Sequence, residues 1–220
     1  MSCNSVTLKM DNYKVHGIDV SHYQSYIDWS TVAEQDIDFA FVKATEGESL
    51  GDSLFAHNWA ELKRVNIRRG AYHFFRPTSP AINQALNFIS KVDIQEGDLP
   101  PVVDVEVADG VSPVIVVQRL RSWLELVERE YNIRPIIYTN QKYYSKFIAG
   151  NFDDYPLWIA RYSKHTPRLN LGSRWTFWQY GDTGRMKGIQ GDVDFNVFHG
   201  ELTELEALCL PESRLYSSLD

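Results

Sequence analysis

Short apolar runs alternate with amphipathic segments along most of this chain, and that alternation restricts the folds it can adopt. Five runs rich in β-branched or aromatic residues are each followed by a turn signal and then by a segment with helical periodicity. Such repetition of strand and helix is typical of a parallel sheet covered by helices. We predict strands at residues 16–21, 39–44, 70–75, 102–107 and 136–139, and helices at 28–35, 53–66, 79–92, 112–131 and 141–148.

The rhythm changes after residue 148, where loops replace helices between the strands. Three more strands are predicted at 157–161, 175–180 and 193–198, with Gly- and Pro-containing segments between them, and a last helix at 201–210 ends before Pro211. Eight strands are the number that closes a barrel filled by side chains. We therefore predict an α/β fold, a modified TIM-like barrel of five βα units followed by three strands, (β/α)5(β)3.

A single domain accommodates all of these elements. The 220 residues contain no linker, internal repeat or low-complexity tract, and they are enough for one large core. We expect an N-terminal extension or linker at 1–15, the barrel domain at 16–210 and a C-terminal tail at 211–220.

Two acidic residues interrupt the apolar stretch 99–110, LPPVVDVEVADG. Asp104 and Glu106 are two positions apart on a predicted strand, so they share a face, with Cα atoms about 6.5–7 Å apart. Acids are rarely buried without a partner, and two that face the same way resist losing both protons. The more desolvated one is expected to have a raised pKa, which a carboxyl group needs in order to donate a proton near neutral pH.

Two further acids occupy matching places on predicted strands. Asp19 lies in GIDVS on the first strand and Asp194 in DVDFN on the last, and these strands are neighbours in a closed barrel. Four carboxylates would then meet at the carboxyl edge, where barrel enzymes place their sites. Hydrogen bonds from loop amides, or pairing with Lys43 and Arg161, explain any one acid equally well. The group of four favours catalysis.

An oxygen-rich cluster of this kind also suits magnesium or calcium. The acids are scattered in the sequence, EF-hand spacing is absent, and no His joins them at ligand spacing. We therefore predict no metal and no other cofactor. A metal-dependent barrel hydrolase acting on phosphate esters is the weaker alternative, and a chelator would inactivate it.

Aromatic residues at predicted strand ends indicate a sugar ligand. Aromatic faces pack against the C–H faces of sugar rings, and Tyr and His tips bind hydroxyl and amide groups. Tyr72, Tyr138 and Trp178 are candidates for such a groove, and a place in the core explains each of them equally well. His73 follows Tyr72 on its strand, so the two should face opposite ways.

Charge and hydropathy argue against two classes of partner. The chain has 22 basic and 29 acidic residues, a formal charge of -7, and no Lys/Arg stripe, which disfavours nucleic acid and an anionic membrane surface. No stretch has the length of a transmembrane helix, and the N-terminus lacks the apolar region of a signal peptide. We expect a targeting segment to have been removed, with Met1-Ser2 as an expression remnant ahead of Cys3.

The two cysteines, Cys3 and Cys209, lie near opposite ends of the chain. Two unrelated thiols are expected in preference to a disulfide. Cys3, followed by Asn4-Ser5, suits the acylated first residue of a mature bacterial lipoprotein, and an ordinary linker cysteine is the alternative.

Eight segments occur in order between about residues 16 and 198: GIDVSHYQ, FVKATEG, GAYHFFRP, PVVDVE, PIIYTN, WIARY, WQYG and VDFN. Each is weak alone, but the ordered set resembles the glycoside hydrolase family 25 lysozymes. These are N-acetylmuramidases, which cleave the β-1,4 bond between N-acetylmuramic acid and N-acetylglucosamine in peptidoglycan. The resemblance implies the same barrel of five βα units plus three strands.

The resemblance also implies a role for each matching residue. Glu106, the second acid of the D-x-E motif, would be the general acid that protonates the leaving glycosidic oxygen. Asp104 would orient the substrate and perturb Glu106, and Asp19 and Asp194 would complete the acidic floor. The residues expected to bind the saccharide are Tyr72, Tyr138, Trp178, Lys43 and Arg161.

The family is regarded as retaining, through either a carboxylate ester or the substrate's own 2-acetamido group. A carboxylate nucleophile needs to lie about 5–5.5 Å from the acid, and Asp104 is near enough to Glu106 in principle. The resemblance further implies peptidoglycan strands as the partner and an exported enzyme that is secreted, periplasmic or anchored through Cys3. We expect a monomer. The alternative function is a catalytically silent peptidoglycan-binding module, against which the presence of all four acids argues.

Overall fold

The computed structural model describes residues 10–169, 172 and 174–211. The expected acylation or pairing of Cys3 and most of the predicted terminal segments therefore lie outside the described residues. Across the described part of the chain, no helix combines the length and the apolar character needed to cross a bilayer.

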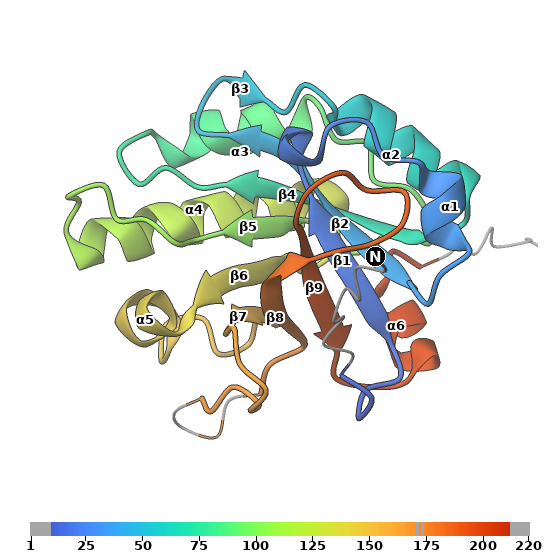
Figure 1. The fold of residues 1–220 in the computed structure, drawn as a ribbon. Coiled ribbons are helices and arrows are strands. Elements are labelled where there is room, and N and C mark those ends of the chain that lie inside the picture. Colours follow the sequence, from blue (N-terminus) through green and yellow to red (C-terminus); the bar gives the residue numbers. More distant parts are fainter. Residues whose placement is uncertain (1–9, 170–171, 173, 212–220) are drawn as a thin grey trace, which may run out of the picture.

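Eight strands close into a barrel, which confirms the predicted architecture (Figure 1). β1 pairs with β2 on one side and with β9 on the other, so the sheet closes on itself. A short extra strand, β3 (Leu50–Gly51), pairs with the end of β2. Around the barrel the strands are β1 (His16–Val20), β2 (Phe39–Glu46), β4 (Arg68–Phe74), β5 (Val102–Asp104), β6 (Ile136–Asn140), β7 (Leu157–Ala160), β8 (Phe177–Gly184) and β9 (Val193–Phe198).

Helices follow the first five barrel strands, as the periodicity predicts. After β6 the chain forms α5 and a π-helical turn, η2 (Tyr144–Ile148), whereas the described parts of the connections between β7, β8 and β9 contain no helix. A 3-10 turn, η1 (His22–Gln24), follows β1. The helices are α1 (Trp29–Ala33), α2 (Phe55–Arg64), α3 (Ala81–Ile89), α4 (Pro113–Tyr131), α5 (Gln141–Tyr143) and α6 (Leu202–Leu208).

The longest helix, α4, shows how local sequence sets an element. Pro113 stands in its first turn, where the missing N–H costs nothing and the fixed φ suits the helix. Asn132 ends it in the left-handed region, with φ of 51°, which Asn tolerates better than most residues. Between these ends Leu120, Trp123 and Val127 follow helical spacing and are fully buried.

Strand alternation divides the barrel into an inside and an outside. Phe39, Phe41 and Trp158 fill the interior, whereas residues of the opposite parity pack beneath the helices. The neighbouring strands leave room for these rings with glycine: a Cβ on Gly17 would lie 2.4 Å from Phe39, and one on Gly70 would lie 2.5 Å from Phe41. The interior is therefore a packed core and not a channel.

Candidate active site

The carboxyl end of the barrel collects one inward side chain from most of its strands. Side chains alternate along a strand, so a residue two positions beyond an interior core residue also faces inward. Phe41 on β2 and Phe177 on β8 belong to the interior core, and Lys43 and Gln179 follow them on the same face. The inward residues at this end are Asp19, Lys43, Tyr72, Asp104, Tyr138, Gln179 and Asp194.

Asp19 and Asp194 meet because the last strand is reversed. β9 runs antiparallel to both β1 and β8, and its register places Asp194 opposite Asp19. The start of β9 therefore lies at the same end of the barrel as the end of β1. The sequence pattern predicts that these two strands are neighbours, but it does not indicate their relative direction.

Two amide side chains hold this acidic pair. Nε2 of Gln179 donates to Oδ2 of Asp19 at 2.8 Å and to Oδ2 of Asp194 at 3.2 Å. Nδ2 of Asn196 donates to the same Asp19 oxygen at 2.7 Å, and its Oδ1 accepts from Nε1 of Trp158 at 2.8 Å. Asp19 is thus buried among donors that favour its ionised form.

Both carboxyl groups of the pair have raised pKa values. Burial raises the pKa of Asp19, and hydrogen bonds from Asn196, Gln179 and Asp194 offset part of the rise. Burial and the charge of Asp19 together raise the pKa of Asp194 to about 9. Asp194 therefore favours its protonated form near neutral pH.

Asp104 and Glu106 lie on one continuous stretch, although only Asp104 belongs to a strand. β5 ends at Asp104, whereas the predicted strand runs to residue 107. The next carbonyl, that of Val105, accepts a hydrogen bond from the Thr139 hydroxyl at 2.6 Å, so a side chain takes the place of the ladder at this point. Glu106 follows in the loop above the barrel and is half-buried.

Both of these acids favour their protonated forms. Burial, reinforced by the charge of Glu106, raises the pKa of Asp104 well above its usual value, and Lys43 offsets part of the rise. Burial and the charge of Asp19 raise the pKa of Glu106, again against Lys43. Oδ1 of Asp104 is buried and has no hydrogen-bond partner. That oxygen is available to a donor supplied by a bound ligand.

Neither predicted basic partner forms an ion pair with the four acids. Nζ of Lys43 bonds Oε2 of Glu46 at 2.8 Å, and Glu46 is also bound by Arg76 at 2.7 Å. Nη1 of Arg161 donates to the carbonyl of Thr166 at 3.0 Å. Lys43 therefore acts on the acids through its charge alone, and Arg161 lies in the loop after β7.

Tyr72 and Tyr138 face the acids. Burial followed by the charges of Asp19 and Asp104 raises the pKa of Tyr72 well above its usual value. Tyr138 donates from its hydroxyl to Oε1 of Gln179 at 2.8 Å. His73, of opposite parity to Tyr72, points outward and stacks on Trp123, which confirms the predicted alternation.

Trp178 does not line a groove. Its side chain is fully buried on the outer face of β8, where it packs against Tyr13, Trp175 and Tyr180 and donates from Nε1 to the Arg161 carbonyl at 2.8 Å. Phe177 already faces the interior, so strand alternation forces Trp178 outward and turns Gln179 inward.

Three residues of the site are not among the sequence-based candidates. Gln179 and Asn196 carry no charge and belong to no general catalytic pattern, although each is buried at inward parity near a strand end. Tyr162 is the last residue of the WIARY segment. It is 55% exposed, and its hydroxyl donates to Gln179 at 3.2 Å. The parity of the neighbouring core residues is the signal that would have revealed both amides.

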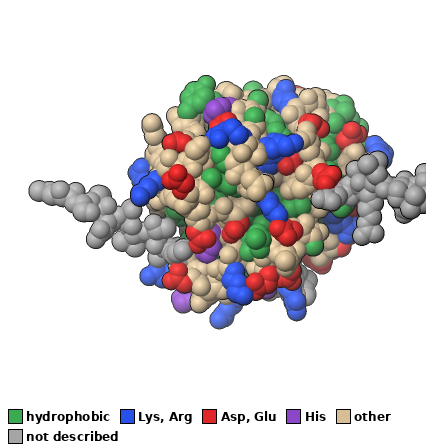
Figure 2. Space-filling view, turned by 90° about the vertical axis from the view of Figure 1, so that its right-hand side faces the viewer, with side chains coloured by type: hydrophobic (Ala, Val, Ile, Leu, Met, Phe, Trp, Pro, Cys, Tyr) green, Lys and Arg blue, Asp and Glu red, His purple; other side chains and the backbone are tan. Residues whose placement is uncertain are grey.

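The arrangement suits proton transfer more than metal binding. In the described part of the chain, no three His, Cys, Asp or Glu side chains are grouped so that they could hold a metal ion. On the face shown in Figure 2, Lys and Arg side chains are scattered among Asp and Glu side chains and form no continuous basic stripe. The site therefore presents carboxyl groups with raised pKa values together with the rings of Tyr72 and Tyr138.

Known proteins share this sequence and fold. The family model described as glycosyl hydrolases family 25 matches residues 18–189. The protein YegX of Escherichia coli strain K12 is 44% identical over 201 residues, covering 89% of this chain and 74% of YegX. Lysozyme M1 of Streptomyces globisporus is 36% identical over 212 residues, covering 90% and 72%. The solved structure of a family 25 glycosyl hydrolase from Bacillus anthracis superposes with a TM-score of 0.86 at 35% identity, over 94% of this chain and 99% of that one.

Proposed function

The chain belongs to glycosyl hydrolase family 25 and is a glycosidase, and on that premise we propose that it cleaves the β-1,4 bond between N-acetylmuramic acid and N-acetylglucosamine in peptidoglycan, with Glu106 as general acid and with net retention. The observation that carries this proposal is the combination of position and protonation at Glu106. Its carboxyl group is half-buried at the mouth of the barrel, and burial and Asp19 raise its pKa. It is therefore both reachable by a glycan and suited to deliver a proton near neutral pH.

The other three acids support the proposed role of Glu106 as general acid. Asp104 is buried beside Glu106, and its unpartnered Oδ1 suits a donor group of the substrate. Asp19 is held by two amides, and its charge adds to the effect of burial in raising the pKa of Glu106. Asp194 neutralises the pair by holding its proton. Asp104 in this way positions the sugar, whichever carboxylate or acetamido oxygen attacks the anomeric carbon.

Aromatic side chains at the mouth suit a saccharide. Tyr72 and Tyr138 flank the acids from β4 and β6, and Tyr162 presents an exposed ring from the loop after β7. Their faces can pack against sugar rings while their hydroxyls stay near Gln179 and the acids. Peptidoglycan lies outside the cell membrane, so this function requires an exported enzyme.

Substitution of the acid tests the proposal directly. Glu106→Gln keeps the size of the side chain and removes the transferable proton, so we expect the release of reducing ends from purified peptidoglycan to fall by about 100- to 10,000-fold. Unchanged thermal unfolding would show that the fold is retained. Mass analysis of the fragments should find muramic acid at the new reducing ends, and glucosamine there would make the enzyme a glucosaminidase. The anomeric configuration of the first product, read by NMR, tests retention.

A silent binding module would give a different result. It would pellet with cell walls in both forms, and neither the wild type nor Glu106→Gln would release reducing ends. Loss of activity on Glu106→Gln together with unchanged pelleting is the outcome that separates an enzyme from such a module.

A further inference from the structure

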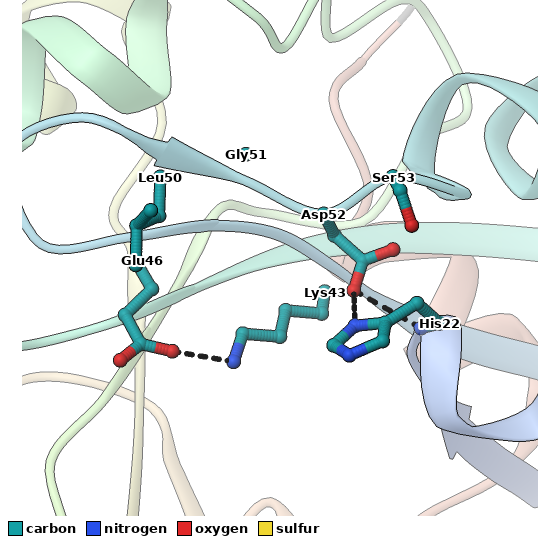
Figure 3. Close-up of a pocket in the computed structure, with 7 residues that line it drawn as sticks. All are labelled: His22, Lys43, Glu46, Leu50, Gly51, Asp52 and Ser53. Carbon is teal, nitrogen blue, oxygen red and sulfur yellow. Dashed lines mark hydrogen bonds and ion pairs between the residues drawn. The ribbon is translucent and has the colours of Figure 1, made fainter.

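A cavity with a volume of about 260 Å³ opens next to Lys43, at the carboxyl end of the barrel (Figure 3). Its walls come from η1, the end of β2 and the segment from β3 to α2, and they include His22, Lys43, Leu50 and Asp52. Lys43 belongs to both places, because its charge acts on Asp104 and Glu106. We call this cavity the side pocket. It adjoins the groove in which a glycan would lie.

His22 is held in one orientation by a buried carboxylate. Oδ2 of Asp52 accepts from the backbone N–H of His22 at 3.0 Å and from its Nδ1 at 2.6 Å. The Asp52 side chain is fully buried, and its other oxygen accepts from the N–H of Leu54 at 3.0 Å. Because an ionised carboxylate can only accept, Nδ1 is assigned as the donor to Asp52, and Nε2 is the ring nitrogen left for a ligand. Figure 3 shows this second nitrogen on the side of the ring away from Asp52.

The opposite wall offers a donor and an apolar surface. Nζ of Lys43 uses one of its three N–H groups on Glu46 at 2.8 Å, which leaves others for a ligand. Leu50 is 61% exposed and presents an apolar side chain at the rim. The side pocket thus combines an acceptor on His22, a donor on Lys43 and an apolar contact on Leu50.

These three features match a secondary amide that carries a methyl group. Its carbonyl would accept from Lys43, its N–H would donate to Nε2 of His22, and its methyl would pack on Leu50. A carboxylate fits less well, because Lys43 already pairs with Glu46 and both Glu46 and Asp52 line the side pocket. The ligand class is therefore neutral and amide-bearing.

We propose that the side pocket binds a secondary amide of the glycan next to the cleaved bond and makes the enzyme selective for walls that carry it. The proposal rests on the proposed function and adds a specificity determinant to it. Peptidoglycan offers this chemistry in two places, the 2-acetamido groups of its sugars and the amide that joins the lactyl group to the stem peptide. His22 and Leu50 are the residues that recognise this amide.

The experiment compares three forms of one peptidoglycan preparation: intact, N-deacetylated, and freed of stem peptides by an amidase. Wild type, His22→Gln and Leu50→Ala are assayed on each for released reducing ends. The matched control is His57→Gln, an exposed histidine on α2 outside the side pocket. Removal of one neutral hydrogen bond corresponds to about a two- to tenfold loss. We expect kcat/KM on intact wall to fall by that factor for His22→Gln and for Leu50→Ala, and to stay unchanged for His57→Gln.

The three substrates identify which amide is bound. A His22→Gln effect that disappears on N-deacetylated wall assigns the pocket to an acetamido group, and one that disappears on stem-free wall assigns it to the lactyl amide. The same fold-loss on all three substrates would overturn the proposal while the wild-type activity upholds the proposed function. A wild type that releases no reducing ends from any substrate would instead refute the proposed function itself.

Discussion

Gln179 joins the acids to the aromatic residues of the site. Its Nε2 donates to Asp19 and Asp194, and its Oε1 accepts from Tyr138 at 2.8 Å and from Tyr162 at 3.2 Å. An amide is the side chain that can donate to carboxylates on one side and accept from hydroxyls on the other without adding charge. The side chain therefore orients four functional groups, and its hydrogen bond to Asp19 lowers the pKa of that acid.

The raised pKa of Asp194 makes the stability of the protein depend on pH. Asp194 has a pKa of about 9 in the folded state and an ordinary low pKa when unfolded. Between these values the folded state holds a proton that the unfolded state has released, so stability falls as pH rises. Asp194→Asn keeps a donor for Asp19 and cannot titrate. We expect its free energy of unfolding, relative to wild type, to increase between pH 5 and pH 8, by at most about 1.4 kcal/mol per pH unit.

Urea unfolding at several pH values measures this difference. Glu125→Gln serves as the control, because it changes an exposed acid on α4 that does not act on the pKa of Asp19 or Asp194, and it should not reproduce this pH dependence. A difference between the unfolding free energies of Asp194→Asn and wild type that stays constant from pH 5 to pH 8 would mean that Asp194 is ionised in the folded protein.

At the scale of single residues, a charged side chain on an apolar strand can be recognised in the sequence as a candidate site residue, whereas an uncharged one cannot. The four acids stand out because burying a carboxylate is costly, so their positions on apolar strands call for a partner or a function. Gln179 and Asn196 are equally buried, but a buried amide is a common feature of cores and does not attract notice. Their roles follow only from neighbours that lie far away in the sequence.

At the scale of elements, β8 shows that neighbouring residues of a strand face opposite sides of the barrel, so a shift by one position changes which residue belongs to the site. Trp178 lies outside the barrel and Tyr162 is exposed at its mouth, so their substitutions should have opposite effects. Trp178→Phe loses a hydrogen bond and buried volume, and we expect it to lower the free energy of unfolding by about 1–3 kcal/mol with kcat and KM unchanged. Tyr162→Ala should instead change stability by less than about 1 kcal/mol and raise KM by about two- to tenfold.

Denaturant unfolding and steady-state kinetics on soluble peptidoglycan fragments, measured for both variants, provide the comparison. A raised KM in Trp178→Phe with unchanged stability would place that ring in contact with substrate and contradict its position on the outer face of β8.

Element order was predictable because periodicity is local, whereas strand ends and directions were not. The eight strands and the helices after the first five follow from alternation and helical spacing within short windows. β5 stops three residues before its predicted end because the Thr139 hydroxyl binds the Val105 carbonyl, a contact made across strands. The reversal of β9 likewise depends on its pairing with β1 and β8, which no window of sequence contains.

The whole molecule has two chemically different ends. At the carboxyl end, buried acids are kept only partly satisfied, which suits a site that binds and protonates a ligand. At the amino end, Arg69 and Asp98 form a buried two-point ion pair, with Nε to Oδ1 at 2.7 Å and Nη2 to Oδ2 at 3.0 Å. Arg69 also lies over the ring of Trp59, 4.0 Å from its centroid, and donates to the Trp59 carbonyl. This end is fully paired and serves stability.

Because the two ends of the barrel are separate, we expect that a substitution at the amino end can lower stability without lowering the activity of the site at the carboxyl end. Arg69→Met leaves Asp98 buried without its partner, and breaking such a pair costs about 3–5 kcal/mol. Asp98→Asn in addition removes the stranded charge and keeps an oxygen for the N–H of Gln95, which Asp98 accepts at 2.8 Å. We expect the double variant to recover most of the lost stability in urea unfolding, and both variants to keep the wild-type kcat at temperatures where they are folded.

The double variant distinguishes two causes of the loss. If unpaired charge is the cause, removing the charge restores stability even though the Arg69 stem and its contact with Trp59 are gone. If packing against Trp59 is the cause, the double variant stays as unstable as the single one, because Asp98→Asn replaces none of that contact. A fall in kcat of the folded single variant would show that the amino end also shapes the acids at the opposite end, and the division of the barrel into a stabilising and a reactive end would be wrong.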